Sequence, residues 1–418
     1  MKVAIINQPF GVIHIPNPGS GISIWTYEVA RRLARRCDVL VYTRRGTSQT
    51  PVETSEGVQY RRISGFPDTW LLKVLRSWWR IRHVRSPIFD ASLYYRAYIW
   101  KIARDLAGQR CDIVHLHNFS QFVPVIRACD PNVKIVLHMH GEWLTQLDPP
   151  TIAERLRMVD LIVGCSEYLT DKIRRRFPQF AERCRTIPNG VDVDCFVRPG
   201  GRAAKTNGDR WRLLFVGRIS PEKGLHVLLE AFGRVLRHDP CAELEIVGPE
   251  WVLPTEFLLD VSDDPKVLQL RRFYNGSSYL AQLQARLPES VAARVTFPGL
   301  LTRKGLVGHY RRADMLINPS LSESFGMSLI EAMACQVPVL ATRVGGMTEI
   351  VEQARAGLLV KPDDPGALAD AILHLLGDDS LRQAFGRAGR EAALQRFAWE
   401  RVTECVWDCY RNIGKFHA

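Results

Sequence analysis

Buried strands alternate with amphipathic helices along almost the whole chain, and the alternation restarts once near the middle. Short apolar runs such as Lys2–Asn7 and Arg212–Gly217 are typical of strands buried on both faces. Each precedes a segment with helical periodicity, Gly21–Arg36 or Glu222–Leu236. Strands that alternate with helices form parallel sheets with helices on both faces. The sequence therefore predicts an α/β protein with two doubly wound, Rossmann-like domains that face a central cleft.

The same patterns predict the remaining elements. Further strands are expected at Asp38–Thr43, Val58–Ile63, Asp112–His117, Lys134–His138, Leu161–Gly164, Cys184–Ile187, Glu243–Val247, Val295–Pro298, Met315–Asn318, Val337–Ala341 and Gly357–Val360. Further helices are expected at Ala91–Gly108, Thr151–Met158, Glu167–Phe177, Tyr279–Leu287, Gly305–Arg311, Gly326–Met333, Pro365–Leu376, Leu381–Arg396 and Trp399–Ile413. The stretch from Trp251 to Ser278 interrupts the alternation and is expected to be an insertion at the cleft rim or a long solvated loop.

The length of the chain indicates two domains, because 418 residues exceed the usual size of a single core. A polar stretch rich in turn-forming residues near the middle is typical of a linker. We expect an N-terminal domain at 1–198, a linker at 199–209, a second domain at 210–396 and a C-terminal helix at 397–418.

The composition is typical of a globular protein, with 46% apolar and 24% charged residues. No apolar run is long enough to span a bilayer, and the N-terminal apolar run is too short for a signal peptide. The ten cysteines form no CxxC pair, which favours reduced thiols over a disulfide framework. These features predict a cytoplasmic protein.

The positive charge is concentrated in the first half: residues 1–210 carry a formal net charge of +13, and the remainder −1. The segment from Trp70 to Arg85 mixes aromatic, aliphatic and basic residues with helical spacing. Such a helix can lie on an anionic membrane surface, which would place the protein at the inner face of the membrane. It can equally pack on its domain with its arginines in water. Without a recognisable binding module, no nucleic acid partner is expected.

Two glutamates, Glu323 and Glu331, surround a turn that leads from a buried strand into a helix. A helix N-terminus binds phosphate because its backbone N–H groups point at the ligand, and Gly326 allows a close approach. A diphosphate between two hydroxyl-bearing rings needs amides in the middle and a hydroxyl acceptor at each end. The motif therefore indicates a nucleotide-sugar site, although two carboxylates could also serve as the acid and base of a hydrolase.

Two cations, Arg218 and Lys223, follow the first strand of the second half, at its carboxyl end. Ligands bind at this edge of doubly wound sheets, and fixed cations there can neutralise a departing diphosphate. The alternative is a pair of solvated surface cations. Ser322 or Ser324 is expected to cap the helix that follows Glu323.

Four histidines lie on two predicted strands, as His115 with His117 and His138 with His140. Alternate residues share one strand face, so a four-histidine metal site is conceivable. No carboxylate or cysteine is spaced to complete it, and no metal is expected. His140 is expected at a strand end that reaches into the cleft, and the other three in the core or around the site.

Taken together, these residues resemble retaining glycosyltransferase family 4, also called glycosyl transferases group 1, whose members have two Rossmann-like domains of the B type. The resemblance covers nearly the whole chain. It rests on Gly19-Ser20-Gly21 (which lacks the spacing of a dehydrogenase dinucleotide site), Ile187–Asp192, Gly217–Gly224, Glu323–Glu331, Val344–Ile350 and Phe397–Arg401.

The resemblance assigns roles to the candidate residues. It implies that Arg218 and Lys223 hold the donor diphosphate and that Glu323 contacts the hydroxyls of the transferred sugar. The backbone amides expected nearby are those of Phe325, Gly326 and Met327.

The remaining roles also come from the resemblance. Glu331 would hold the ribose, and the backbone around Gly299 and Leu300 would meet the base. His140 would lie near the reacting sugar, and the turn from Gly19 to Gly21 near the phosphates and the acceptor. The first domain would then bind the acceptor and the second the nucleotide-sugar, with the final helix crossing back to the first domain.

The sequence thus predicts a retaining, metal-independent glycosyltransferase that uses no cofactor. It would move a hexose-type sugar from a nucleoside-diphosphate-sugar to an acceptor hydroxyl, with UDP favoured over GDP-mannose. The expected acceptor is a lipid-linked or cell-envelope saccharide, as in polysaccharide biosynthesis. A sugar-nucleotide epimerase of the same double fold and a non-catalytic membrane-surface scaffold are the alternatives.

Overall fold

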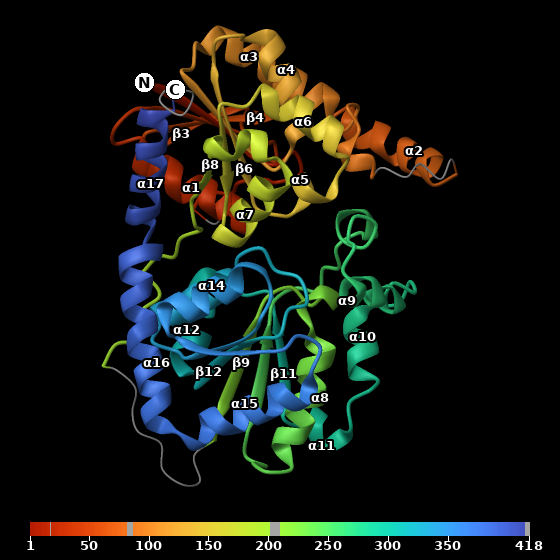
Figure 1. Cartoon of the computed structure of the whole chain (residues 1–418), viewed down its shortest axis with the longest axis vertical. Coiled ribbons are helices and arrows are strands. Elements are labelled where there is room, and N and C mark those ends of the chain that lie inside the picture. Colours follow the sequence, from red (N-terminus) through yellow and green to blue (C-terminus); the bar gives the residue numbers. More distant parts are fainter. Residues whose placement is uncertain (17, 82–86, 201–209, 414–418) are drawn as a thin grey trace. The chain divides into compact units, whose positions relative to one another are not determined.

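The computed structural model describes residues 1–16, 18–81, 87–200 and 210–413, except for the side chains of residues 76–81. Its contacts divide the chain into two compact units, Met1–Asn189 with Trp399–Ala418, and Gly190–Ala398. Each unit contains one sheet and the helices that cover it (Figure 1), which confirms the predicted α/β class. Beyond Gly200, the expected linker at 199–209 lies outside the described residues.

The sheet of the first unit has eight strands in the order β3-β4-β2-β1-β5-β6-β7-β8. They are β1 (Lys2–Ile6), β2 (Asp38–Arg44), β3 (Val52–Ser55), β4 (Val58–Ile63), β5 (Ile113–His117), β6 (Lys134–Met139), β7 (Leu161–Gly164) and β8 (Cys184–Thr186). All pair in parallel except β3, which forms an antiparallel hairpin with β4. The sequence did not reveal β3, because this edge strand buries no face and carries polar residues.

The helices of this unit are α1 (Gly21–Leu33), α2 (Asp68–Ile81), α3 (Arg96–Gln109), α4 (Val123–Cys129), α5 (Trp143–Gln146), α6 (Pro149–Arg157), α7 (Glu167–Arg176) and α17 (Trp399–Asn412). Figure 1 shows α17 beside α1, although the two are far apart in the sequence. Arg32 pairs with Glu400 at 2.8 Å, and Trp399 and Val402 belong to the same apolar core as Val3. The C-terminal helix therefore returns to the first domain, as predicted.

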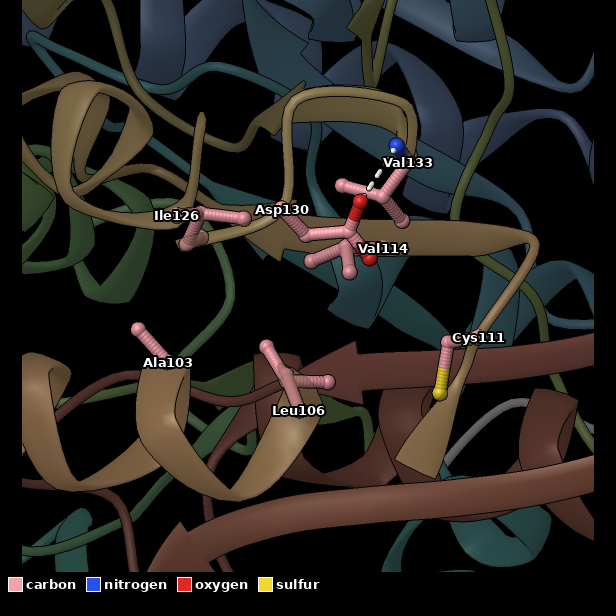
Figure 2. Close-up of a pocket in the computed structure, with 7 residues that line it drawn as sticks. All are labelled: Ala103, Leu106, Cys111, Val114, Ile126, Asp130 and Val133. Carbon is pink, nitrogen blue, oxygen red and sulfur yellow. Dashed lines mark hydrogen bonds between the residues drawn. The ribbon is translucent and has the colours of Figure 1, made fainter. Parts of the chain in front are cut away.

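A small void lies in the core of this unit, between α3 and β5 (Figure 2). Ala103 and Leu106 of α3 face Cys111, Val114 and residues near the end of α4 across it. Burial raises the pKa of the Cys111 thiol to about 11. Since the void has no room for even a water molecule, it is a packing gap and not a binding site.

The sheet of the second unit has six parallel strands in the order β11-β10-β9-β12-β13-β14. They are β9 (Arg212–Val216), β10 (Glu243–Val247), β11 (Val295–Gly299), β12 (Met315–Asn318), β13 (Val339–Thr342) and β14 (Gly357–Val360). The chain runs outward from β9 to β11 and then returns to β12 on the other side of β9. Ligands bind at such a switch point, outside the carboxyl ends of β9 and β12.

The helices of the second unit are α8 (Leu225–Leu236), α9 (Pro265–Leu268), α10 (Tyr279–Gln284), α11 (Glu289–Ala292), α12 (Arg303–Arg312), α13 (Met327–Ala334), α14 (Gly345–Ala354), α15 (Pro365–Gly377) and α16 (Asp379–Ala392). The insertion at 251–278 is not a solvated loop. Its short helical turns bury Leu259, Val267 and Phe273 in the core of this unit. None of the helices in the described ranges combines the length and the apolar character that a bilayer-spanning segment requires.

Candidate active site

The turn that follows β9 is held tightly against the end of β12. Gly224 has a φ of +68°, and a Cβ built on it would lie 2.1 Å from the carbonyl oxygen of Pro319. Only glycine permits this close approach without strain. The backbone N–H of Leu321 also donates to the carbonyl of Glu222 at 2.8 Å. The two segments that carry the predicted donor site therefore form one rigid assembly.

Lys223 and Glu323 meet in this assembly, with 2.7 Å between Nζ and Oε2 and side chains that are 14% and 20% exposed. The second carboxylate oxygen of Glu323 accepts the Phe325 N–H at 3.4 Å. Burial acts to raise the pKa of Glu323, but the charge and hydrogen bond of Lys223, the Phe325 amide and the charge of Arg218 together hold it below its ordinary value. Glu323 is therefore ionised at neutral pH.

Arg218 is oriented by two neighbours that sequence reasoning missed. Its Nη2 lies 3.0 Å from Oε1 of Glu222, whose side chain is only 2% exposed. The Ser220 hydroxyl donates to the same carboxylate oxygen. The guanidinium also lies over the ring of Trp251, 4.9 Å from its centroid, where a cation–π contact forms. Arg218 is thus a preorganised cation, with one of its five N–H groups directed at Glu222.

Helix α13 starts at Met327, and its N-cap residue is Gly326, with a φ of +112°. The expectation that Ser322 or Ser324 caps this helix is wrong, because the N-cap residue is Gly326, which has no side chain to accept an N–H of the first turn. A Cβ at Gly326 would lie 3.1 Å from side-chain atoms of Leu329 and Met347. The N-cap position is therefore occupied by a glycine packed against neighbouring side chains, and no side chain supplies a cap hydrogen bond.

Glu331 lies further along α13 in a different environment. Its Oε2 accepts the hydroxyl of buried Tyr310 at 2.6 Å. Burial raises the pKa of Glu331 to about 7, although the Tyr310 hydrogen bond and the charge of Arg303 oppose this effect. Tyr310 comes from α12, 21 residues earlier, and no sequence pattern links it to Glu331. The two glutamates thus differ in charge near neutral pH.

Gly299 and Leu300 lie at the carboxyl end of β11, on the same edge of the sheet as Arg218 and Asn318. The Gly299 carbonyl accepts the Gly248 N–H at 3.0 Å, and the Leu300 side chain is 76% exposed. Leu300 is therefore exposed at this edge of the sheet.

In the first unit, the glycine turn precedes α1, whose N-cap is Ser20. Cβ atoms built on Gly19 and Gly21 would meet nothing within 4 Å, so the turn borders open space. His140 follows β6, and its backbone N–H donates to Asn118 Oδ1 at 2.7 Å. Burial lowers the pKa of His140 to about 3, against the effect of a hydrogen bond with Asn189. His140 is therefore neutral at physiological pH.

The other three histidines, His115, His117 and His138, are fully buried, with side-chain nitrogens within 4.8 Å of one another. The group is compact enough for a metal ion, but it contains no carboxylate or thiolate. Most of its nitrogens already have partners: His115 pairs with His138 at 3.1 Å and with the hydroxyl of Tyr410 at 2.7 Å, whereas Nε2 of His138 has no hydrogen-bond partner among the described residues. His117 is 3.0 Å from His140. This arrangement fits a neutral hydrogen-bonded core that supports His140.

Comparison with known families gives matches over most of the chain. The description "Glycosyl transferases group 1" matches residues 202–392, and "Glycosyltransferase Family 4" matches residues 19–195. A D-inositol 3-phosphate glycosyltransferase of Kineococcus radiotolerans is 30% identical over 98% of this chain and 95% of its own. Spore coat protein SA of Bacillus subtilis is 24% identical over 99% of this chain and its own whole length.

Solved structures share the fold at lower identity. Sucrose-phosphate synthase from Thermosynechococcus elongatus superposes with a TM-score of 0.72 at 22% identity, over 99% of both chains. HepE of Anabaena in complex with UDP-glucose has a TM-score of 0.68 at 18% identity, over 99% of this chain and all of its own.

Proposed function

This chain belongs to the glycosyl transferases group 1 family and is a glycosyltransferase, and we propose that it moves a hexose-type sugar from a nucleoside-diphosphate-sugar to an acceptor hydroxyl, with retention of configuration. The observation that carries this proposal is the pairing of Lys223 with Glu323 beside Arg218, at the mouth of α13. Two cations and an ionised carboxylate at one helix N-terminus match a donor that has a diphosphate next to a hydroxyl-bearing ring.

The chemical difficulty of the reaction is the negative charge that develops on the leaving diphosphate. Arg218 and Lys223 stabilise this charge without a divalent ion, as preorganised donors in a site of low dielectric constant. The Lys223 ammonium has three N–H groups, so it can contact phosphate and Glu323 together. Glu323 accepts hydroxyls of the transferred sugar, and Glu331 those of the ribose. No protein nucleophile is assigned, and the leaving phosphate assists deprotonation of the acceptor.

Uridine diphosphate is the proposed donor nucleotide, ahead of GDP-mannose. Support comes from HepE, whose structures contain UDP or UDP-glucose, and from UDP-forming trehalose-phosphate synthases of the same fold. The base would contact the backbone around Gly299 and Leu300.

The proposed acceptor is a lipid-linked or cell-envelope saccharide, bound by the basic first domain near His140 and the turn at Gly19 to Gly21. The protein would then act in the cytoplasm, at the inner face of the membrane. The basic segment from Trp70 to Arg85 reaches beyond the described side chains, so its membrane role stays a prediction. The family match favours transfer over the epimerase and the scaffold that the sequence alone left open.

A nucleotide-sugar screen by thermal stabilisation, followed by transfer assays, tests the proposal. Lys223→Ala and Glu323→Ala should each slow transfer by about two to three decades, corresponding to about 2.7–4 kcal/mol of barrier. Arg234→Ala is the matched control, because it breaks an exposed ion pair on α8. Chelator should leave transfer unchanged. Transfer by either site variant at the rate of the control would overturn the assignment, and loss of activity on chelation would overturn metal independence.

A further inference from the structure

A polar pocket of about 490 Å³ lies in the first unit and has no part in the function proposed so far. It opens where β2 and β4 end, because Arg44 is the last residue of β2 and Ser64 follows β4. Its lining residues are Arg44–Gln49, Ser64–Phe66 and Thr69. Since β2 and β4 are parallel, the pocket lies on the carboxyl edge of the sheet, where ligands of such folds bind.

The wall of the pocket is held in place by its own hydrogen bonds. Gln49 donates from Nε2 to the carbonyl of Ile13 at 2.9 Å and accepts the Gly46 N–H at 2.9 Å. The N–H of Arg45 donates to the carbonyl of Ile63 at 2.9 Å, which extends the contact between β2 and β4. The segment that carries both arginines is therefore preorganised.

The charges of these two arginines have no acidic partner in the described part of the chain. Among the residues that the structure describes, neither Arg44 nor Arg45 forms an ion pair, whereas Arg61 and Arg62 on the neighbouring strand pair with Asp105 and Glu53. Arg44 is half-buried and lies against Gly65, where an added Cβ would be 3.2 Å from its Nε. An unpaired guanidinium held in a pocket favours an anionic ligand.

Hydroxyl groups complete the lining, from Thr47, Ser48, Ser64 and Thr69. The Ser64 oxygen accepts the Phe66 N–H at 3.3 Å, so its own hydrogen remains available to a ligand. Two guanidinium groups with several hydroxyls match an anion with many acceptor oxygens, above all phosphate.

We propose that this pocket binds a phosphate group carried by the acceptor. This inference rests on the proposed transfer reaction and specifies its acceptor as a phosphate-bearing molecule. The cations assigned to the donor diphosphate, Arg218 and Lys223, belong to the other unit. The phosphate can belong to a soluble sugar phosphate or to a lipid headgroup, since both present anionic phosphate oxygens.

Binding measurements on the full chain test this proposal with two probes, glucose 6-phosphate and vesicles that contain phosphatidylglycerol. Arg44→Gln and Arg45→Gln should each weaken binding of at least one probe by tenfold or more. Arg104→Gln is the matched control, because it removes an equal charge from the exposed surface of α3, and it should leave binding unchanged. Glucose, which lacks the phosphate, should bind more weakly than its 6-phosphate. If the pocket variants lose binding of glucose 6-phosphate, the acceptor is a soluble sugar phosphate. If they lose binding of the vesicles, the acceptor is a lipid.

The affinity for UDP-glucose distinguishes a failure of this proposal from a failure of the proposed donor site. It should be the same in Arg44→Gln, Arg45→Gln and the wild-type protein. Unchanged binding of both probes in both pocket variants would overturn the acceptor site, even if UDP-glucose binds as proposed. Equal weakening by Arg104→Gln would also overturn it, because binding would then follow overall charge.

Discussion

Donor binding should strengthen as the pH rises from 6 to 8, because Glu331 changes its charge in this range. Burial raises the pKa of this carboxyl to about 7. With that pKa, about 10% of the Glu331 side chains are ionised at pH 6 and about 90% at pH 8. In the proposed donor complex the ionised carboxylate would accept ribose hydroxyls with both oxygens, whereas the protonated form accepts fewer hydrogen bonds. If only the ionised form binds, the dissociation constant falls by about tenfold, or about 1.4 kcal/mol.

Calorimetric titration with UDP-glucose measures this effect directly, since its diphosphate has no group that titrates in this range. Glu331→Gln is the matched control and should remove the pH dependence. Tyr310→Phe should move the midpoint of the pH dependence to a higher pH. Loss of a hydrogen bond to a charged group, about 1.5–3 kcal/mol, raises the pKa of Glu331 by about one to two units. The reasoning is refuted if the wild-type protein and Glu331→Gln follow the same pH profile, or if Tyr310→Phe leaves the midpoint in place.

Three further predictions concern the supports of the site. Glu222→Ala should reduce donor turnover by about tenfold to a hundredfold, because the Arg218 guanidinium loses the carboxylate that orients it. Glu222→Gln should recover part of this loss. Turnover by Glu222→Ala at the wild-type rate would contradict the role of Glu222. Gly224→Ala should lower the free energy of unfolding in urea by about 2 kcal/mol or more, whereas Gly233→Ala, inside α8 and with its nearest contact at 3.5 Å, should not. Burial lowers the pKa of His115 and His140 to about 3, so the unfolded chain binds more protons below about pH 6.5. The free energy of unfolding should therefore decrease as the pH is lowered from 7 to 5. A constant value would show that these histidines are not held in the neutral form by burial.

Most of the fold could be predicted because each buried parallel strand leaves a local apolar signature. The strands β4, β7, β10, β12 and β14 were expected at the residues where they occur. Several elements were not predicted, among them α4, β3 and α14. The exposed edge strand β3 buries no face, and α14 begins with Gly345 and Gly346, which have low helix propensity.

The candidate site could be predicted only in part. The residue types at Arg218, Lys223, Glu323 and Glu331 indicated phosphate and hydroxyl recognition, and the structure brings Lys223 and Glu323 into contact. Sequence reasoning missed Glu222, although it lies inside the same turn. Nothing in a sequence shows that this glutamate is buried and directed at Arg218 while its neighbour Lys223 is directed elsewhere.

The sequence by itself determined the order of strands and helices, the places where the chain turns at a carboxyl end, and the chemical groups available there, because these depend on neighbouring residues. Only the tertiary structure decided which groups became partners and which charges they carry. Lys223 and Glu323 are separated by 100 positions, and Tyr310 reaches Glu331 from another helix. Burial and partners set the pKa of a carboxyl, and both depend on packing between distant segments. Two glutamates of one motif can therefore differ, with Glu323 ionised and Glu331 poised near neutrality.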